Sequence, residues 1–297
     1  MSRAKLYLST RVPFTGISST YDKSSFVFFG VPYDKTSTYK AGSKFAPGAL
    51  REISANMELY SVRSGVDLEK VAVHDWGDVD IVEDLVETLG RVKSICSELL
   101  DAKKIPIMVG GEHSITKAAA DTLPEDTCLV SFDAHLDLRD EYLGEKLSHA
   151  TFMRRVSERL GSDHLMEIGI RAFSKSELDF TRKSGVMIIT PQDLRKGGLQ
   201  KTAQRIKGFL SGFSHSYVTV DIDVLDPAFA PGVGNPEPDG LSTDELLTLV
   251  EATMEKNTVG FDLVEVSPQL DSGQTAAVGV KVIFEAIAAL STRSHKT

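Results

Sequence analysis

The chain has 297 residues, of which 41% are hydrophobic and 25% are charged, which is an ordinary globular composition. A formal net charge of -9 argues against a nucleic-acid-binding protein, because phosphate contacts need clustered Lys and Arg. No segment approaches the roughly 18 apolar residues of a membrane span, and the first residues lack a signal-peptide core, so we expect a cytoplasmic protein without a membrane partner. Cys96 and Cys128 lie far apart in apolar segments, and we expect reduced core residues.

Eight short apolar runs predict β-strands at 25–31, 71–75, 105–109, 128–133, 165–170, 185–190, 217–222 and 260–266. The runs are nearly continuous rather than alternating, which is typical of strands buried on both faces of a parallel sheet. Helical periodicity at 80–104 and 273–293, and a capping-box start at 242–256, predict helices between or after them. We therefore expect an α/β fold: one domain over 1–297, with three α/β/α layers and an eight-stranded, mostly parallel sheet.

Acidic and histidine side chains follow four of these strands, at the edge where open parallel sheets bind ligands. They are His113, Asp133, His135, Asp137, Asp221, Asp223 and Glu265. Residues two apart on extended backbone point to the same face, so the alternate residues within 133–137 and 221–223 are expected to converge. Four neighbouring carboxylates need cations, and two divalent ions would balance them. Oxygen ligands with imidazole and no Cys favour Mn²⁺, with Fe, Co or Ni left open.

Other interpretations of these residues fit the sequence less well. The stretch "DIDVLD" lacks the Gly and the terminal Glu of a calcium loop, and we expect Asp226 within it to shape a turn. An apolar strand ending in DxD also resembles the nucleophile motif of haloacid-dehalogenase-type phosphatases. That motif normally lies on the first strand, and it would leave the acids and histidines of 113–137 unexplained. The other histidines are expected to be structural: His74, His164, His215 and His295.

Five motifs resemble the ureohydrolase family, which includes arginase and agmatinase. They are "GGEHSIT", "SFDAHLDLRDEY", "SHATFMRR", "TVDIDVLDPAFAPG" and "GFDLVEVSP", and together they extend over nearly the whole chain. The resemblance implies an arginase-like fold and two Mn²⁺ ions per subunit. It implies that one ion is held by His113, Asp133, Asp137 and Asp221, and the other by Asp133, His135, Asp221 and Asp223. It also implies a homo-oligomer, a trimer or a hexamer.

The resemblance further implies hydrolysis of a guanidino compound by a hydroxide that bridges the two Mn²⁺ ions. By the same resemblance, Glu265 pairs with the substrate guanidinium and His149 exchanges protons with solvent. We expect Asp133 to carry the proton from the former water to the leaving amine. Glu112, Ala150 and Asp239 depart from the usual family pattern. None of the three replaces an expected ligand, so an active enzyme is expected.

The substrate is less well defined by the sequence. Arg139 stands where arginases carry an Asn that recognises the amino-acid head group, and the phrase around His149 is more similar to agmatinases. We therefore expect hydrolysis of agmatine to putrescine and urea, with Asp140, Glu141 or Glu145 attracting the distal cation. Guanidinobutyrase, arginase and formimidoylglutamase activities stay open, as does an inactive metal-binding regulator.

Overall fold

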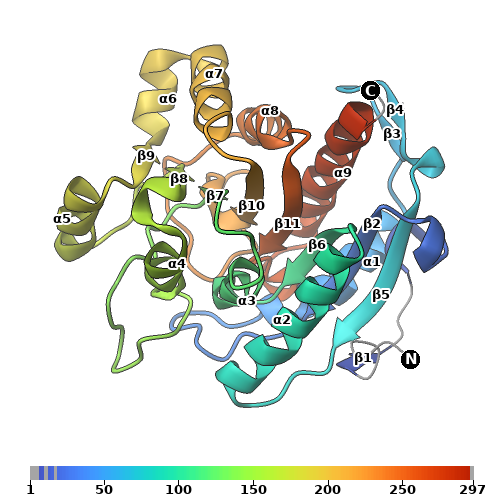
Figure 1. Ribbon diagram of the computed structural model, residues 1–297, viewed down its shortest axis with the longest axis horizontal. Helices are drawn as coiled ribbons and strands as arrows, with labels where there is room; N and C mark the ends of the chain where they lie inside the picture. The colour runs from blue at the N-terminus through green and yellow to red at the C-terminus, as the bar shows by residue number, and fades with distance from the viewer. Residues whose placement is uncertain (1–6, 10–12, 17–18, 295–297) are drawn as a thin grey trace.

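The computed structural model describes residues 7–9, 13–16 and 19–294. Within these residues the main sheet has nine strands in the spatial order β1-β5-β2-β6-β11-β10-β7-β8-β9 (Figure 1). Eight of them are parallel: β2 Phe26–Val31, β5 Val73–Val79, β6 Ile105–Gly110, β7 Thr127–Phe132, β8 Leu165–Ile168, β9 Met187–Ile189, β10 His215–Asp221 and β11 Thr258–Val264. The predicted eight-stranded parallel sheet is confirmed. The ninth strand, β1 Leu8–Ser9, is an antiparallel edge strand that the sequence did not reveal.

Helices cover both faces of the sheet, so the predicted three-layer fold is also confirmed. The α-helices are α1 Ala46–Ser54, α2 Leu85–Asp101, α3 Thr116–Ala120, α4 Phe152–Leu160, α5 Lys175–Ser184, α6 Pro191–Gly197, α7 Leu199–Leu210, α8 Thr243–Thr253 and α9 Gln274–Ser294. Helices α1, α7, α8 and α9 share one apolar core with the sheet, whereas α2, α3 and α4 share the other. The continuous apolar runs of the strands supply side chains to both cores, as a doubly covered parallel sheet requires.

Short elements complete the chain. The 3-10 helices are η2 Phe14–Gly16, η3 Tyr21–Lys23, η4 Ser43–Phe45, η5 Leu68–Lys70, η6 His113–Ile115, η7 Ser162–His164, η8 Ile222–Val224 and η9 Pro268–Leu270. A small hairpin pairs β3 Tyr60–Ser61 with β4 Val66–Asp67. Helices η6 and η8 directly follow β6 and β10, so they start at the carboxyl edge of the sheet.

Helix α9 changes one expectation. Its stretch Gln274–Arg293 is long and apolar enough to cross a membrane by length and composition alone, contrary to the prediction that no segment approaches such a span. In the fold, 78% of this stretch is buried. It packs against α1 and α8, as the core helix of a globular domain does.

A buried cation joins α1 to the sheet. Arg51 is 1% exposed, and its guanidinium donates to Asp75 at 2.7 and 2.9 Å and to Asp78 at 2.5 Å. Both acids lie on β5, so this one cation forms ion pairs with two carboxylates that have almost no access to water. Cys96 and Cys128 are both buried and free, as the sequence predicts.

The order of the strands determines where functional residues meet. Strands β6, β11, β10 and β7 are direct neighbours in the centre of the sheet, and they run in the same direction. Val220 of β10 is in register with Phe132 of β7, and Asp221 is in register with Val264 of β11. The segments that follow these strands therefore leave the sheet side by side.

Candidate active site

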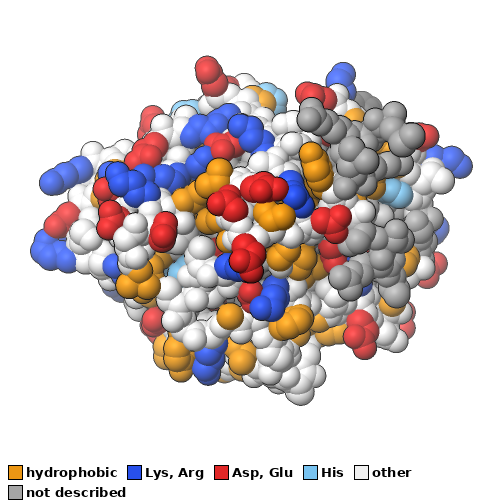
Figure 2. Space-filling view, turned by 90° about the horizontal axis from the view of Figure 1, so that it is seen from below, with side chains coloured by type: hydrophobic (Ala, Val, Ile, Leu, Met, Phe, Trp, Pro, Cys, Tyr) orange, Lys and Arg blue, Asp and Glu red, His pale blue; other side chains and the backbone are white. Residues whose placement is uncertain are grey.

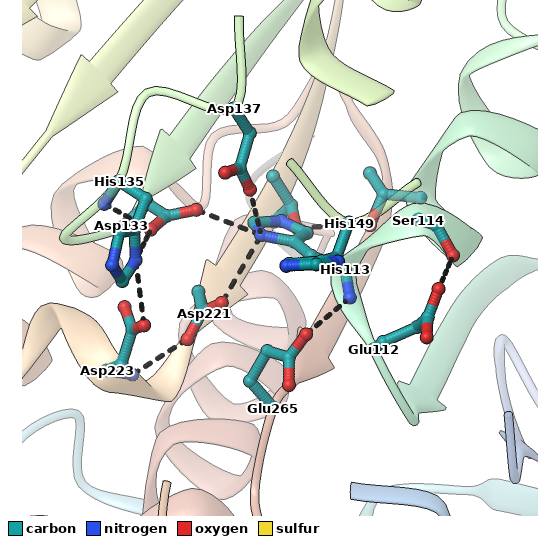
Figure 3. Close-up of polar contacts among 12 residues, drawn as sticks. Glu112, His113, Ser114, Asp133, His135, Asp137, His149, Asp221, Asp223 and Glu265 are labelled. Atoms are coloured by element: carbon teal, nitrogen blue, oxygen red, sulfur yellow. Dashed lines mark hydrogen bonds and ion pairs between the residues drawn. The ribbon is translucent and has the colours of Figure 1, made fainter. Parts of the chain in front are cut away.

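Six of the predicted side chains meet at this edge of the sheet (Figure 3). They are His113 at the start of η6, Asp133, His135 and Asp137 after β7, Asp221 at the end of β10, and Asp223 in η8. All but His135 and Asp137 are buried at the 3% level or below. The structure therefore brings together side chains from widely separated parts of the sequence, from His113 to Asp223.

The donor atoms form two groups that share Asp133. In the first group, His113 Nδ1 lies 2.9 Å from Asp133 Oδ2 and 3.4 Å from Asp221 Oδ2. In the second group, His135 Nδ1 lies 3.0 Å from Asp223 Oδ2 and 3.6 Å from Asp133 Oδ1. Within each group the ligand atoms lie within 4.8 Å of one another, so each group could surround one metal ion.

The backbone conformation of Asp137 turns its side chain toward the first group. Asp137 Oδ2 lies 3.7 Å from His113 Nδ1, and Asp137 has a φ of 50°. This left-handed conformation is unfavourable for residues other than glycine. Strand β7 already ends at Phe132. The alternation of an extended strand, on which we based the expected convergence, is therefore the wrong reason for the position of Asp137.

The second pair of acids departs from a strand in the same way. Asp221 ends β10, and Asp223 lies in η8, where its backbone N–H donates to Asp221 Oδ1 at 2.8 Å. After β7, the backbone N–H of His135 donates to Asp133 Oδ1 at 2.6 Å. Each first acid thus fixes the turn that places the next ligand candidate.

His113 has a ring nitrogen free to bind a metal. Its Nε2 lies 2.8 Å from Thr219 Oγ1, and that hydroxyl donates to Asp262. The Thr219 oxygen therefore accepts from Nε2–H, which leaves a lone pair on Nδ1. Nδ1 is buried and forms no hydrogen bond within the described part of the chain. An orphaned nitrogen that faces three carboxylates fits a metal ligand.

The electrostatics of the cluster indicate a shortage of positive charge. Burial and neighbouring carboxylates raise the pKa of Asp137 and of Asp221 well above their usual range. Burial would lower the pKa of both His113 and His135, but contacts with the acids raise it well above the usual value. Divalent cations would supply the missing charge, and carboxylate plus imidazole without thiolate suits ions such as Mn²⁺. The residues present therefore fit a binuclear metal centre.

Glu265, the residue directly after β11, borders this centre. It has a φ of 63°, and its Oε1 accepts a hydrogen bond from the backbone N–H of His113 at 2.9 Å (Figure 3). Burial, together with the nearby Glu112, raises the pKa of Glu265 to about 8. A bound cation would favour its charged form.

His149 lies on the same cavity as Glu265, as expected for a proton-exchanging group. Burial lowers its pKa to about 4, with further contributions from His135 and His113. Its ring nitrogen Nδ1 lies 3.2 Å from Thr36 Oγ1. The ring is therefore neutral at physiological pH and is oriented by a residue that the sequence did not single out.

A cavity of about 730 Å³ opens above these residues. Besides the candidates already named, its lining includes Tyr39, Arg139, Tyr142, Arg171, Phe173 and Glu237. Seen from below, acidic and hydrophobic side chains lie side by side near the middle of the molecule (Figure 2). The cavity therefore offers charged and apolar surface to one ligand.

The acids proposed to attract a distal cation are not in the lining. Asp140, Glu141 and Glu145 do not border this cavity, and Asp140 instead accepts from Arg155 Nη2 at 2.8 Å. Glu237, from loop 226–241, does border it and makes no hydrogen bond or ion pair through its carboxylate with any described residue. No feature of the sequence separates Glu237 from the other loop acids.

Arg139 borders the cavity with its charge already engaged. Its Nε lies 3.6 Å from Glu177 Oε2, and its guanidinium lies 5.0 Å from the centre of the Tyr142 ring. Glu177 is 3% exposed and also accepts from the backbone N–H of Leu138. The guanidinium therefore already has an anionic partner within the protein.

The structure shows the local environment of two residues that depart from the family pattern, Asp239 and Ala150. Asp239 has a φ of 67°, a conformation that Asp tolerates better than most residues, and it accepts from Arg195 Nη1 at 2.5 Å. Ala150 is 8% exposed and lines the cavity. Asp226 shapes the turn as expected, because its Oδ2 accepts from the backbone N–H groups of Asp239 and Gly240.

The three other histidines within the described residues lie outside the site. His74 and His164 place Nδ1 within 2.7 and 3.0 Å of the backbone carbonyls of Ser19 and Thr127. His215 begins β10, and His295 lies outside the described residues. None of the three described side chains borders the cavity.

Comparison with known proteins gives consistent matches over most of the chain. The sequence model of the arginase family matches residues 24–289. An agmatinase of Bacillus cereus is 37% identical over 90% of this chain and 92% of its own length. An N(1)-aminopropylagmatine ureohydrolase of Thermococcus kodakarensis is 35% identical over 91% and 92%. The crystal structure of an agmatine ureohydrolase of Thermoplasma volcanium superposes with a TM-score of 0.90 and 37% identity, covering 97% of both chains.

Proposed function

The chain belongs to the arginase family, as a ureohydrolase that cleaves C–N bonds of amidines, and on this premise we propose that it hydrolyses agmatine to putrescine and urea with two Mn²⁺ ions. The observation that carries the choice of agmatine is the distribution of charge in the cavity. Glu237 presents a carboxylate there without a hydrogen bond or ion pair to any described residue, and the cation of Arg139 is paired with Glu177. Arg171 also lines the cavity, but its guanidinium donates to backbone carbonyls, among them those of Asp223 and Glu237. A substrate with a distal ammonium group is therefore favoured over one with a distal carboxylate.

The two metal ions would be held by the two groups that share Asp133: His113 with Asp137 and Asp221, and His135 with Asp223. Bound there, they supply a nucleophile at neutral pH by lowering the pKa of water. The sequence motifs imply the same six residues, which supports the proposal. The motifs also assign Asp221 to the second ion, whereas the structure groups Asp221 with His113. Native metal identity is tested by element analysis of protein purified without added metal, and a metal other than Mn²⁺ would contradict that part.

The side chains around the metals divide the remaining work. Glu265 binds the planar guanidinium through charge-assisted hydrogen bonds, because the bound cation favours the charged form of this carboxyl, whose pKa burial otherwise raises to about 8. Asp133 carries a proton from the attacking water toward the leaving nitrogen. His149 then exchanges protons between the cavity and solvent, since its ring is neutral and borders the cavity.

A second candidate substrate is favoured by the size of the cavity. A volume of about 730 Å³ exceeds what agmatine alone would fill, because cavities in this range accommodate drug-sized ligands. Agmatine extended by an aminopropyl group carries two distal ammonium groups besides the guanidinium, and both would meet the acidic side chains of this lining. One relative carries the name of a ureohydrolase for that compound.

The deciding experiment measures turnover of a substrate panel by Mn²⁺-loaded protein. Agmatine, aminopropylagmatine, arginine and guanidinobutyrate are compared through urea release, and formimidoylglutamate through formamide release. We expect the highest kcat/KM for agmatine or its aminopropyl derivative. Comparable turnover of arginine or guanidinobutyrate would contradict the proposal. Two bound metal ions without turnover of any of these compounds would favour an inactive metal-binding regulator.

Three expectations from the sequence stay predictions. They are a single domain over 1–297, a trimeric or hexameric assembly and a cytoplasmic location. Light scattering of the purified protein checks the assembly, and a monomer would contradict it.

A further inference from the structure

Loop 32–45, which follows β2, is held against the active site by a buried acid. Glu112 is fully buried, and its Oε2 accepts from the backbone N–H of Thr36 at 2.6 Å. Its Oε1 accepts from the Thr36 hydroxyl and from the Ser114 hydroxyl, each at 2.6 Å. Both oxygens of Glu112 therefore act as acceptors, and the two 2.6 Å contacts with hydroxyls have the length of hydrogen bonds to a carboxylate.

The backbone around this contact has little freedom. A Cβ placed on Gly111 would lie 1.8 Å from the carbonyl oxygen of Tyr33, so loop 32–45 and the end of β6 approach too closely for any side chain there. The backbone N–H of Glu112 also donates to that carbonyl at 2.8 Å. The Thr36 hydroxyl is therefore held in a defined place beside the cavity.

The same hydroxyl contacts His149 twice. Thr36 Oγ1 accepts from the backbone N–H of His149 at 2.9 Å and lies 3.2 Å from its Nδ1. A hydroxyl has one proton, and its shortest contact, at 2.6 Å, is to the carboxylate of Glu112. Charge-assisted hydrogen bonds are the stronger ones, so the proton is directed to Glu112 and the oxygen accepts from Nδ1–H.

We propose that Glu112 and Thr36 are positioning residues that hold His149 in the Nδ1–H tautomer, which leaves its Nε2 as the free base for proton exchange. When Nε2 takes a proton, the resulting imidazolium faces a hydroxyl that is already oriented by an anion. The arrangement is equivalent to an acid that orients a catalytic histidine, with a hydroxyl inserted between the two groups. The inference deepens the proposed function, because it rests on proton exchange by His149.

Replacement of Thr36 by Val tests the hydroxyl at nearly constant volume. In the Mn²⁺-loaded full chain we expect kcat to fall roughly 10-fold or more, with KM changed less than about threefold, since proton transfer rather than binding is impaired. Thr36→Ser keeps the hydroxyl and should recover most of the activity. Ser37→Ala is the matched control, because it removes a neighbouring hydroxyl that forms no hydrogen bond among the described residues. Element analysis should find two metal ions per chain in every variant.

A double-mutant cycle separates positioning from a general effect on the fold. If Thr36 acts through His149, Thr36→Val should change kcat less than about twofold in a His149→Asn background. Glu112→Gln, which keeps the shape and removes the charge, should behave as Thr36→Val in both backgrounds. An equal loss in the two backgrounds, or a fully active Thr36→Val variant, would overturn the inference.

A measurement without turnover separates this inference from the proposed function. In ¹⁵N-histidine-labelled protein loaded with diamagnetic Zn²⁺, two-bond ¹⁵N–¹H couplings distinguish Nδ1–H from Nε2–H. His149→Asn identifies the resonance. We expect the Nδ1–H form in the wild-type chain and in Thr36→Ser, and its loss in Thr36→Val. An Nε2–H form in the wild type refutes the positioning, whereas the expected tautomer without hydrolysis of any guanidine refutes the function alone.

Discussion

Charge removal at Glu237 gives opposite predictions for two substrates. Glu237→Gln keeps the length of the side chain and removes one negative charge from the cavity lining. Agmatine carries a distal ammonium, and guanidinobutyrate carries a distal carboxylate at nearly the same distance from the guanidine. We therefore expect the substitution to weaken the use of agmatine and to improve the use of guanidinobutyrate.

The size of the effect follows from the exposure of the side chain. Two unit charges about 4 Å apart interact by about 4 kcal/mol at an effective dielectric constant of roughly 20. Glu237 is half-buried in a cavity that is open to solvent, and screening reduces such pairs to about 1 kcal/mol. That energy corresponds to about a fivefold change in kcat/KM for each substrate, in opposite directions. The ratio of the two values should therefore change by roughly 20- to 30-fold.

Steady-state urea release with both substrates measures this ratio at low and at high salt. Glu141→Gln is the control, because Glu141 is an exposed acid that does not line the cavity. The change should become smaller at high salt, since exposed charges are screened. The reasoning is refuted if Glu237→Gln alters both substrates in the same direction, or if Glu141→Gln has the same effect.

Three further predictions concern metal binding and stability. Asp133→Ala should remove most bound Mn²⁺ and all activity, because both ligand groups contain Asp133; element analysis that finds two ions would contradict the shared position. Arg51→Ala removes the guanidinium that contacts two buried carboxylates on β5 and should lower the free energy of unfolding by about 3–5 kcal/mol, as measured by urea denaturation. Glu167 is 1% exposed with neither oxygen hydrogen-bonded in the described residues, and burial raises its pKa well above the usual range. The buried Glu167 is compatible with the fold while it is protonated at low pH, and this stability is lost as the pH rises through its raised pKa. Glu167→Gln should therefore stabilise the protein at pH 8 by about 1–3 kcal/mol and much less at pH 4.

The fold could be predicted from the sequence because strands buried on both faces of a sheet have a simple hydrophobic pattern. Most of the parallel strands appear as nearly continuous apolar runs, since neither face of the sheet meets water. The exception is β5, which carries Asp75 and Asp78. β1 has only two residues and pairs at the sheet edge, so it lacks any such pattern. Helix α9 looks like a membrane span for the same reason that it is a good core helix, and only its packing separates the two.

The site was accessible in part. Its acids and histidines could be found because parallel strands end at one edge, but the backbone that aims Asp137 could not, since a φ of 50° has no signature in an aspartate. Glu112 was recognisable as a departure from a family pattern. Its partner Thr36 was not, because the two residues are 76 positions apart and meet only when loop 32–45 folds back. Cavity residues such as Glu237 come from loops, whose paths depend on tertiary contacts.

The left-handed backbones of Asp137 and Glu265 matter for engineering this protein. Residues other than glycine in that conformation cost about 1 kcal/mol or more each, and both side chains are also carboxylates with raised pKa values. Glycine at either position would relieve the backbone strain and remove a buried acid in one step. A library selected for heat resistance alone would therefore enrich inactive variants at these two positions. Screens for thermostable forms of this protein need an activity measurement in every round.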